Sequence, residues 1–468
     1  MKEKKKKTDH LLALIREGRP MTSGEQLRLT VALSVPAIVT QLSAIVMQYI
    51  DAAMVGSLGA NASASIGLVS TTTWLFWGLC AAASTGFSVQ VAHRIGADDW
   101  DCARSILRRS VPSTFAFSAL LAAIGVSVSG ALPQWLGGDS AIRSDASLYF
   151  LIFSLFLPIL QMNFLAAGML RCSGNMRIPS IAGILMCILD VVFNFFLIFP
   201  SREFSAGGLT LSIPGAGLGV QGAALGTGLA AITLWYLFTR SSGLKIKAWR
   251  KSPSLPTPPI VRNSIRISLP MGLEHVVICG AQIMTTVIVA PLGIPAIAAN
   301  SFAITAESLC YMPGYGIADA ATTLVGQSLG AGRHRLTRRF AYITVFMGMV
   351  VMGIMGVVMY IFAPQIIGTM TPVEEIRRLG VMALRIEAFA EPMFAAAIIS
   401  YGVFVGAANT LVPSLMNFFS IWAVRISLAA WLAPTMGLKG VWVAMCAELC
   451  FRGIIFLIRL RGKRWMKI

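Results

Sequence analysis

The sequence predicts an all-α membrane protein with twelve transmembrane helices in two six-helix lobes, related by a pseudo-two-fold axis along the membrane normal. Three observations lead to this fold class. Only 12% of the 468 residues are charged, against about 25% in an average soluble domain. Apolar runs near the roughly 20 residues that cross a bilayer recur along the whole chain. The two halves of the sequence also repeat each other.

Each apolar run is predicted to be a helix, because a span surrounded by lipid must satisfy its backbone hydrogen bonds internally. The strand-and-turn pattern of a β-barrel is absent. The predicted spans cover residues 30–57, 63–92, 110–134, 146–170, 179–200, 215–239, 266–291, 297–327, 340–365, 379–406, 413–434 and 437–458. The resulting division is an N-terminal segment at 1–29, an N-terminal lobe at 30–239, an inter-lobe linker at 240–265, a C-terminal lobe at 266–458 and a basic tail at 459–468.

The distribution of basic residues predicts the orientation. Loops on one side of the predicted membrane carry Arg94, Arg104, Arg108, Arg109, Arg240, Lys245, Lys247, Arg250, Lys251, Arg333, Arg335, Arg338 and Arg339. The opposite loops carry only Arg143, Arg202, Arg377, Arg378 and Lys439. By the positive-inside rule, both termini, the linker and the tail are predicted to be cytoplasmic, in a multi-pass protein of the inner membrane. The first long apolar run begins only near Leu29, so we expect no cleaved signal peptide.

Composition excludes several classes of protein. The net charge of +18 lies in short segments between apolar runs, unlike the continuous basic face of a nucleic-acid-binding domain. The eight cysteines show neither a disulfide framework nor zinc-ligand spacing. The four histidines form no catalytic pattern, and no soluble domain fits between the spans, so we predict no enzyme, no cofactor and no metal. The predicted partners are the bilayer and small-molecule substrates, and the chain is expected to be a monomer.

The two halves match at a constant shift of 234 residues. Pro36, Leu58, Gly59, Gly96, Pro158, Gly168, Asn175, Pro179 and Ser180 correspond to Pro270, Leu292, Gly293, Gly330, Pro392, Gly402, Asn409, Pro413 and Ser414. A repeat of six spans preserves orientation, so the pseudo-two-fold axis runs along the membrane normal and a substrate path is expected at the lobe interface. This architecture is typical of transporters. A duplicated structural protein and a channel are the alternatives, although a channel would more often be an oligomer around one pore.

Four segments resemble the multidrug and toxic compound extrusion (MATE) exporters. They are PAIVTQLSAIVMQYIDAAMVGSLG, ILDVVFNFFLIF, GVQGAALGT and ATTLVGQSLGAG, and together the resemblance covers nearly the whole chain. It implies a secondary antiporter that exports organic, cationic or amphipathic compounds in exchange for protons or sodium ions. A flippase or exporter of a lipid-linked or polymer precursor, in the same superfamily, is the alternative.

Charged residues inside spans usually face a cavity or a partner, so each is a candidate functional residue. In the first, fifth and sixth spans these are Asp51, Asp190, Asn194 and Thr227. Asp190 and Asn194 share a helical face at a spacing of four residues, and Asn194 lies at the depth of Asp51. The resemblance, nearest to the DinF-like branch, implies that these positions bind the coupling ion, although the fifth helix carries its Asp and Asn in reversed order. A purely structural hydrogen bond from Asp190 is the alternative.

A second group lies in the C-terminal lobe. Glu274, His275 and Asp319 are predicted to form either a second polar site or a gate. The other main branch of the family has a cation-binding Glu on the seventh helix and an Asp on the tenth. Here Glu274 falls about one turn before the first position, while Phe394 occupies the second, with Glu391 about one turn away. Arg425 and Glu448 are predicted to form a structural ion pair.

Overall fold

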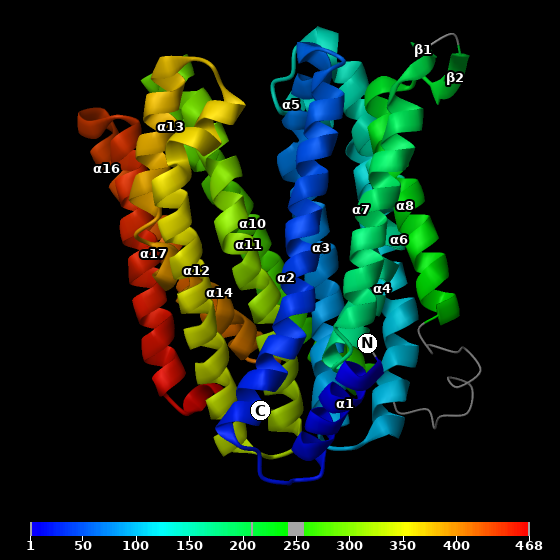
Figure 1. The fold of residues 1–468 in the computed structure, drawn as a ribbon, viewed down its shortest axis with the longest axis vertical. Coiled ribbons are helices and arrows are strands. Elements are labelled where there is room, and N and C mark those ends of the chain that lie inside the picture. Colours follow the sequence, from blue (N-terminus) through cyan, green and yellow to red (C-terminus); the bar gives the residue numbers. More distant parts are fainter. Residues whose placement is uncertain (1, 207–208, 242–256, 467–468) are drawn as a thin grey trace.

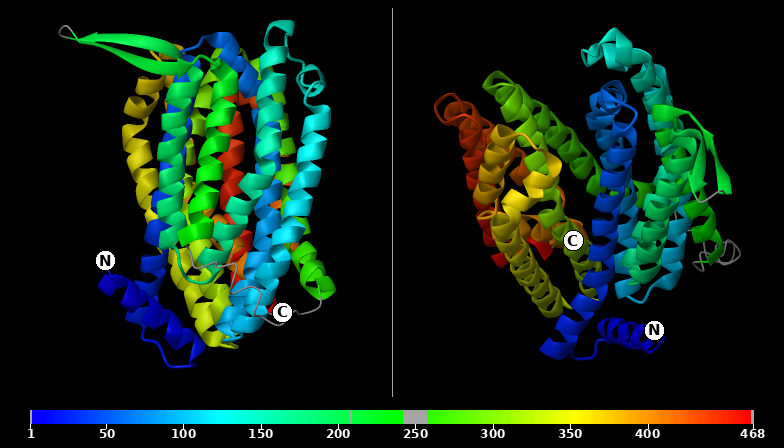
Figure 2. Two further views of the ribbon diagram at one scale, coloured as in Figure 1. Left: turned by 90° about the vertical axis from the view of Figure 1, so that its right-hand side faces the viewer. Right: turned by 45° about the horizontal axis from the view of Figure 1, so that its top comes forward.

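A computed structural model describes residues 2–206, 209–241 and 257–466 of the chain. Long, nearly parallel helices form two bundles that stand side by side (Figure 1). Both chain termini lie toward one end of these bundles, which we call the terminal end. A β-hairpin lies at the other end, the hairpin end, and extends away from the bundle (Figure 2).

The N-terminal half forms one bundle. Its elements are α1 (Lys2–Arg16), α2 (Ser23–Gly56), α3 (Ala60–Gly96), α4 (Trp100–Val128), α5 (Leu132–Trp135), α6 (Ser140–Cys172), α7 (Arg177–Ile198), β1 (Pro200–Ala206), β2 (Leu209–Ala216) and α8 (Gly219–Ser241). The strands β1 and β2 pair antiparallel. The amphipathic α1 packs with its leucines against the start of α2 and against α11 of the other half.

The C-terminal half forms the second bundle. Its elements are α10 (Thr257–Val289), η1 (Ala290–Leu292), α11 (Ile294–Gly330), α12 (His334–Met370), α13 (Glu374–Glu387), α14 (Glu391–Gly406), α15 (Leu411–Phe419), η2 (Ser420–Ile426), α16 (Ser427–Met436), α17 (Leu438–Arg461) and η3 (Arg464–Met466). Most of the predicted linker lies at 242–256, outside the described residues, and α10 begins at Thr257.

Every predicted span coincides with helix in the structure. Within the described part of the chain, nine helices are long and apolar enough to cross a membrane, and α13 with α14 forms a tenth span bent by 61°. The two remaining predicted spans correspond to α8 and α11. Many helices extend beyond the predicted spans, because hydropathy detects only the apolar part of a helix whose polar ends reach into water.

Two spans of the C-terminal half are irregular. The predicted span 379–406 breaks between Glu387 and Glu391, just before Pro392, which lacks an amide hydrogen for a continuous helix. The predicted span 413–434 contains the π-helical segment η2 in its middle. Such widened turns often occur at functional sites. Neither irregularity was predicted, and the β1–β2 hairpin was not predicted either.

Backbone conformation repeats with the sequence. Gly59 and Gly293, at the predicted shift of 234, both precede a long helix with a positive φ, of 117° and 97°. The same shift pairs Asp98 with Gly332 and Gly174 with Ala408, and all four have a positive φ. Asp98 and Ala408 are the two non-glycine residues in this region of φ within the described chain. The duplicated loops therefore keep one backbone shape even where the glycine has been replaced.

The lobes meet along four helices. Helix α2 packs along α11, and α3 packs along α10 and α11. At Gly316 of α11 a Cβ would lie 2.6 Å from the backbone nitrogen of Ile38 in α2, so these helices touch backbone to backbone. Toward the hairpin end, the helices of the two lobes diverge (Figure 1).

The repeated loop shape predicts the effect of two matched substitutions. A left-handed backbone costs alanine about 1–2 kcal/mol, so Ala408→Gly is expected to leave the melting temperature unchanged or raise it. Gly174→Ala is expected to lower it, because the added Cβ would also overlap Leu12. The control is Ala407→Gly, which removes the same methyl group at a φ of −83° and is expected to destabilise. Thermal unfolding in detergent measures all three. Equal destabilisation by Ala408→Gly and Ala407→Gly would contradict the backbone argument.

Candidate functional site

A carboxyl pair lies inside the N-terminal lobe. The amide nitrogen of Asn194 in α7 donates to Asp51 of α2 at 2.9 Å and to Asp190 of α7 at 3.2 Å. The Thr227 hydroxyl of α8 contacts the Asp190 carboxyl. Thus the four predicted coupling residues lie in one cluster, contributed by the three predicted spans. Asp190 and Asn194 are almost completely buried.

The cluster contains no basic side chain to balance its acids. Among the described residues, no arginine, lysine or histidine acts on either carboxyl, and Tyr149 of α6 lies close to both. One carboxylate oxygen of Asp190 and the amide oxygen of Asn194 are buried without a hydrogen-bond partner. Two carboxylates sharing a dry site cannot both ionise without a large cost. The arrangement can therefore hold a proton between the acids or offer oxygens to a small monovalent cation.

A cavity of about 450 Å³ lies between the lobes. Helices α2, α3, α6 and α7 line one side, and α10, α11 and α14 line the other. The lining is mainly apolar and aromatic, and its polar residues include Gln41, Arg171, His275, Asp319 and Tyr401. Such a lining, apolar with few polar groups, is typical of a small-molecule site.

Glu274 belongs to the C-terminal lobe alone. Its carboxylate accepts hydrogen bonds from Tyr401 of α14, from Ser414 of α15 at 2.7 Å and from Asn417 at 2.5 Å. The neighbouring His275 instead faces the inter-lobe cavity, and its Nδ1 has no hydrogen-bond partner. Glu274 thus connects three helices of one lobe just behind the cavity wall.

Asp319 has a partner in the opposite lobe. It lies in α11 and forms an ion pair of 2.8 Å with Arg171 at the end of α6. Both residues line the cavity near the terminal end. The structure therefore does not join Glu274 and Asp319 in one site, because each carboxylate has separate partners. The sequence did not single out Arg171, since it stands at the edge of a span where basic residues are common.

Two equivalent hydrogen bonds close the lobes together at the terminal end. Nε2 of His93 in α3 lies 2.7 Å from the carbonyl oxygen of Gly406 in α14. The Gln327 side-chain amide in α11 donates to the carbonyl oxygen of Cys172 in α6 at 2.7 Å. The shift of 234 residues relates His93 to Gln327 and Cys172 to Gly406. One inter-lobe contact is therefore made twice, once from each lobe.

The backbones of α3 and α11 cross beside these hydrogen bonds. A Cβ at Gly96 would overlap the carbonyl group of Gln327, and a Cβ at Gly330 would overlap that of His93. Gly96 and Gly330 are again a repeat pair. Small residues allow this close approach of membrane helices. We call these two hydrogen bonds and the glycine crossing the terminal seal.

Arg425 and Glu448 form an ion pair that includes a third residue. Glu448 is fully buried and lies 2.7 Å from the Arg425 guanidinium of η2 and 2.7 Å from that of Arg452 in α17. Ser420 also donates to it, at 2.6 Å. The sequence missed Arg452, although its spacing of four residues from Glu448 places both on one helical face.

Three further buried glutamates lie in the C-terminal lobe. Glu307 belongs to α11, while Glu387 and Glu391 stand on either side of the bend between α13 and α14. Neither carboxylate oxygen of Glu387 or of Glu391 has a hydrogen-bond partner. Neither Glu307 nor Glu387 was predicted from the sequence. The depth of Glu387 cannot be read from hydropathy, because it lies at the break of its span. Among the described residues, no three acidic, histidine or cysteine side chains are arranged to hold a metal ion.

Known proteins resemble this chain over almost its whole length. The sequence profile of the MatE family matches twice, at residues 36–196 and 270–431, so the matches begin at the same shift as the repeat. A probable multidrug resistance protein NorM from Thermotoga maritima is 24% identical over 93% of this chain and 92% of its own. The corresponding protein of Brucella suis is 28% identical over 94% and 93%.

Solved structures share the fold. One, described as the outward-facing conformation of a multidrug resistance MATE family transporter of the MOP superfamily, has a TM-score of 0.86 at 20% identity and covers 98% of this chain and 99% of its own. A mutant of the Vibrio cholerae MATE transporter VcmN also has a TM-score of 0.86, at 16% identity over 94% and 97%. These similarities confirm the predicted twelve-helix fold in two lobes.

The different surroundings of Glu448 and Glu387 predict different effects on stability when each is replaced by glutamine. Glu448→Gln leaves the buried Arg452 and the partly buried Arg425 without a counter-charge, and the loss of one partner of a buried pair costs about 3–5 kcal/mol. Glu387→Gln removes a carboxyl that has no partner and is expected to keep or raise stability. The free energy of unfolding in detergent distinguishes them. Equal destabilisation by both variants would contradict this assignment of charges.

The terminal seal predicts a change in thiol access. Cys172 is buried at the seal, and Gln327→Ala removes the hydrogen bond to its carbonyl group. We expect faster modification of Cys172 by N-ethylmaleimide, measured on the cysteine-containing peptides by mass spectrometry. The partly exposed Cys102 serves as the internal reference. Gln161→Ala is the matched control, because Gln161 bonds Ser84 within one lobe. An unchanged rate at Cys172 would show that the hydrogen bond does not hold the lobes together.

Proposed function

The chain belongs to the MatE family, and on that premise we propose that it is a secondary active antiporter that exports organic, cationic or amphipathic compounds in exchange for protons or sodium ions. It is a multi-pass membrane transporter and not an enzyme. Its relatives and its structural neighbours are transporters too. The names of the NorM relatives support multidrug efflux as its activity. The coupling ion and the class of substrate are our proposal.

The carboxyl pair of Asp51 and Asp190 carries the proposal. Its acids lie in a buried site without a basic partner, linked through Asn194. Membrane proteins rarely bury acids in this way unless the acids bind something. When both acids are ionised their repulsion favours uptake of a proton or a cation, and when one is neutralised the repulsion disappears. The state of the site thus changes the packing of α2, α7 and α8, from which the cluster is built.

The inter-lobe cavity is the proposed site for the exported compound. Its volume of about 450 Å³ and its mixed aromatic and polar lining fit an organic molecule with few hydrogen-bonding groups. The cavity carries Asp319, whose charge Arg171 balances. A flippase for a lipid-linked precursor would require a more cationic lining, since such substrates carry phosphates, and Arg171 is the one arginine among the described lining residues. This favours the export of small compounds.

The basic loops at the terminal end support an orientation in the inner membrane in which this end faces the cytoplasm. In that orientation the terminal seal closes the cavity on the cytoplasmic side, and the lobes diverge toward the outside. The carboxyl pair then lies in the outer half of the N-terminal lobe. Ions from outside would reach the carboxyl pair by a short path. Their binding would lower the affinity of the inter-lobe cavity for the exported compound. The seal would open when the lobes rock toward the opposite arrangement.

Export by variants in vesicles tests this function. Asp51→Asn and Asp190→Asn are expected to abolish gradient-driven transport of ethidium, because each removes a carboxyl that changes charge during the cycle. Proton and sodium gradients are applied separately, and the one that drives the wild-type protein identifies the ion. Asp145→Asn is the control, since this carboxyl belongs to the same lobe but not to the cluster. Full transport by Asp51→Asn, with the same dependence on the gradient, would contradict the proposal.

A further inference from the structure

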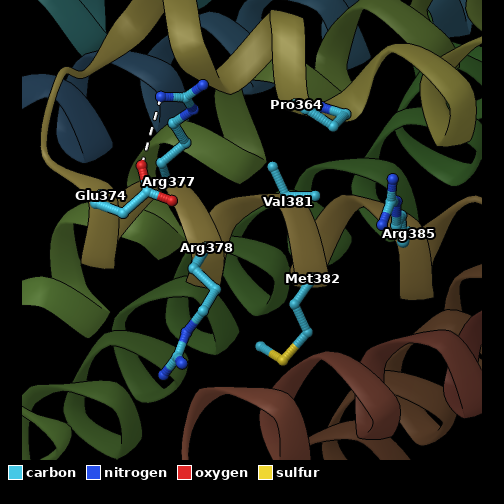
Figure 3. Close-up of a pocket in the computed structure, with 7 residues that line it drawn as sticks. All are labelled: Pro364, Glu374, Arg377, Arg378, Val381, Met382 and Arg385. Atoms are coloured by element: carbon cyan, nitrogen blue, oxygen red, sulfur yellow. Dashed lines mark hydrogen bonds and ion pairs between the residues drawn. The ribbon is translucent and has the colours of Figure 1, made fainter.

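Three arginines gather at the hairpin end of the C-terminal lobe. Arg377, Arg378 and Arg385 of α13 line a surface pocket of about 390 Å³ with Pro364 of α12 (Figure 3). Arg377 approaches Glu374 at 3.5 Å. Within the described part of the chain, no carboxylate pairs with Arg378 or Arg385.

The pocket continues into an apolar surface that faces away from the protein. The Arg385 guanidinium lies 5.3 Å from the ring centroid of Tyr360, and the rings of Tyr360 and Phe389 lie 5.7 Å apart. Phe389 is 71% exposed, and Tyr360 of α12 is 42% exposed. Exposed aromatic rings beside arginines are typical of the membrane–water interface. Arg377 lies beside Gly368 of α12 and Arg385 lies beside Tyr360, eight residues earlier in that helix, so Arg385 lies farther from the hairpin end than Arg377.

Nε of Arg385 donates a hydrogen bond to the carbonyl oxygen of Tyr360 at 3.5 Å, and the side chain is exposed. Its charge is costly beside hydrocarbon unless it reaches water, phosphate or an acidic side chain. The cluster also departs from the charge distribution of the chain, whose other loops at the hairpin end carry few basic residues. The exported compound does not explain the arginines, because they lie outside the inter-lobe cavity. Coupling cations do not explain them either, since the three charges would repel a cation.

We propose that Arg378 and Arg385 bind the phosphate of one anionic phospholipid from the leaflet at the hairpin end. Its acyl chains would lie along the exposed rings of Tyr360 and Phe389. Arginine suits this role because its planar guanidinium can donate two hydrogen bonds to one phosphate. Val381 and Met382 provide the apolar floor between the two arginines (Figure 3). Arg377 remains with Glu374 at the rim.

Native mass spectrometry of the full chain in detergent tests this site. The probe is phosphatidylglycerol, with zwitterionic phosphatidylethanolamine as the comparison lipid. We expect the wild-type protein to retain phosphatidylglycerol preferentially. Each of Arg378→Gln and Arg385→Gln is expected to lower retention about fivefold, the effect of one arginine near an anionic surface. Arg143→Gln is the matched control, because it removes another exposed arginine at the same end and is expected to have no effect.

A second measurement locates the lipid. Phosphatidylglycerol with a photoactivatable acyl chain is expected to crosslink to residues 354–389, and the double variant is expected to lose this crosslink. Equal retention of both lipids by the wild-type protein, equal retention by the double variant, or crosslinks elsewhere would each overturn the proposal. So would displacement of the lipid by millimolar inorganic phosphate, which would identify a site for free anions. Thermal unfolding of each variant separates loss of the lipid from loss of the fold.

Discussion

The crossing of α3 and α11 at the terminal end is the contact on which the arrangement of the lobes depends. Gly96 and Gly330 bring the two backbones together, and His93 and Gln327 each donate one hydrogen bond to a backbone carbonyl oxygen of the other lobe. Because the repeat relates these pairs, a movement of the lobes that keeps their two-fold relation breaks both contacts together. The seal is therefore a single unit with two equivalent halves, as expected of an interface with two-fold symmetry. Glutamine and histidine are not equivalent chemically, so only one half can take up a proton.

The two lobes have a similar backbone structure, but their buried acidic residues lie at different positions of the repeat. The shift of 234 residues relates Asp51 to Thr285, and Glu274 to Thr40. The positive φ values of the duplicated loops show that the local backbone was kept in both halves. A fold that accepts threonine at either position does not require a carboxylate there. The acids of each lobe are therefore additions to a common scaffold, and their cost of burial is explained by binding more readily than by folding.

Sequence alone predicted the regular part of this structure, the cluster around Asp51 and Asp190, and the ion pair of Arg425 with Glu448. Asp51, Asp190 and Asn194 could be grouped because their helices are long and unbroken, so that spacing along the chain gives depth and face. Glu387 could not be placed in the same way, because it lies beside a bend of 61°. Arg452 lies on the unbroken helix α17, where its spacing of four residues from Glu448 is visible in the sequence, but the second arginine of that site comes from a π-helical segment of another span. Partners such as Arg171, which reaches Asp319 from the other lobe, depend on tertiary packing that periodicity does not contain.

Two helices connect the carboxyl pair to the cavity directly. Helix α2 carries the cavity residue Gln41 and, ten residues later, Asp51, a rise of about 15 Å. Helix α7 carries the cavity residue Met186 and, one turn later, Asp190. A shift of either helix that relieves repulsion between the acids therefore also moves the cavity wall. The proposed coupling between ion and substrate would then need no chain of intermediate residues, because the same helices form part of both the carboxyl pair and the cavity.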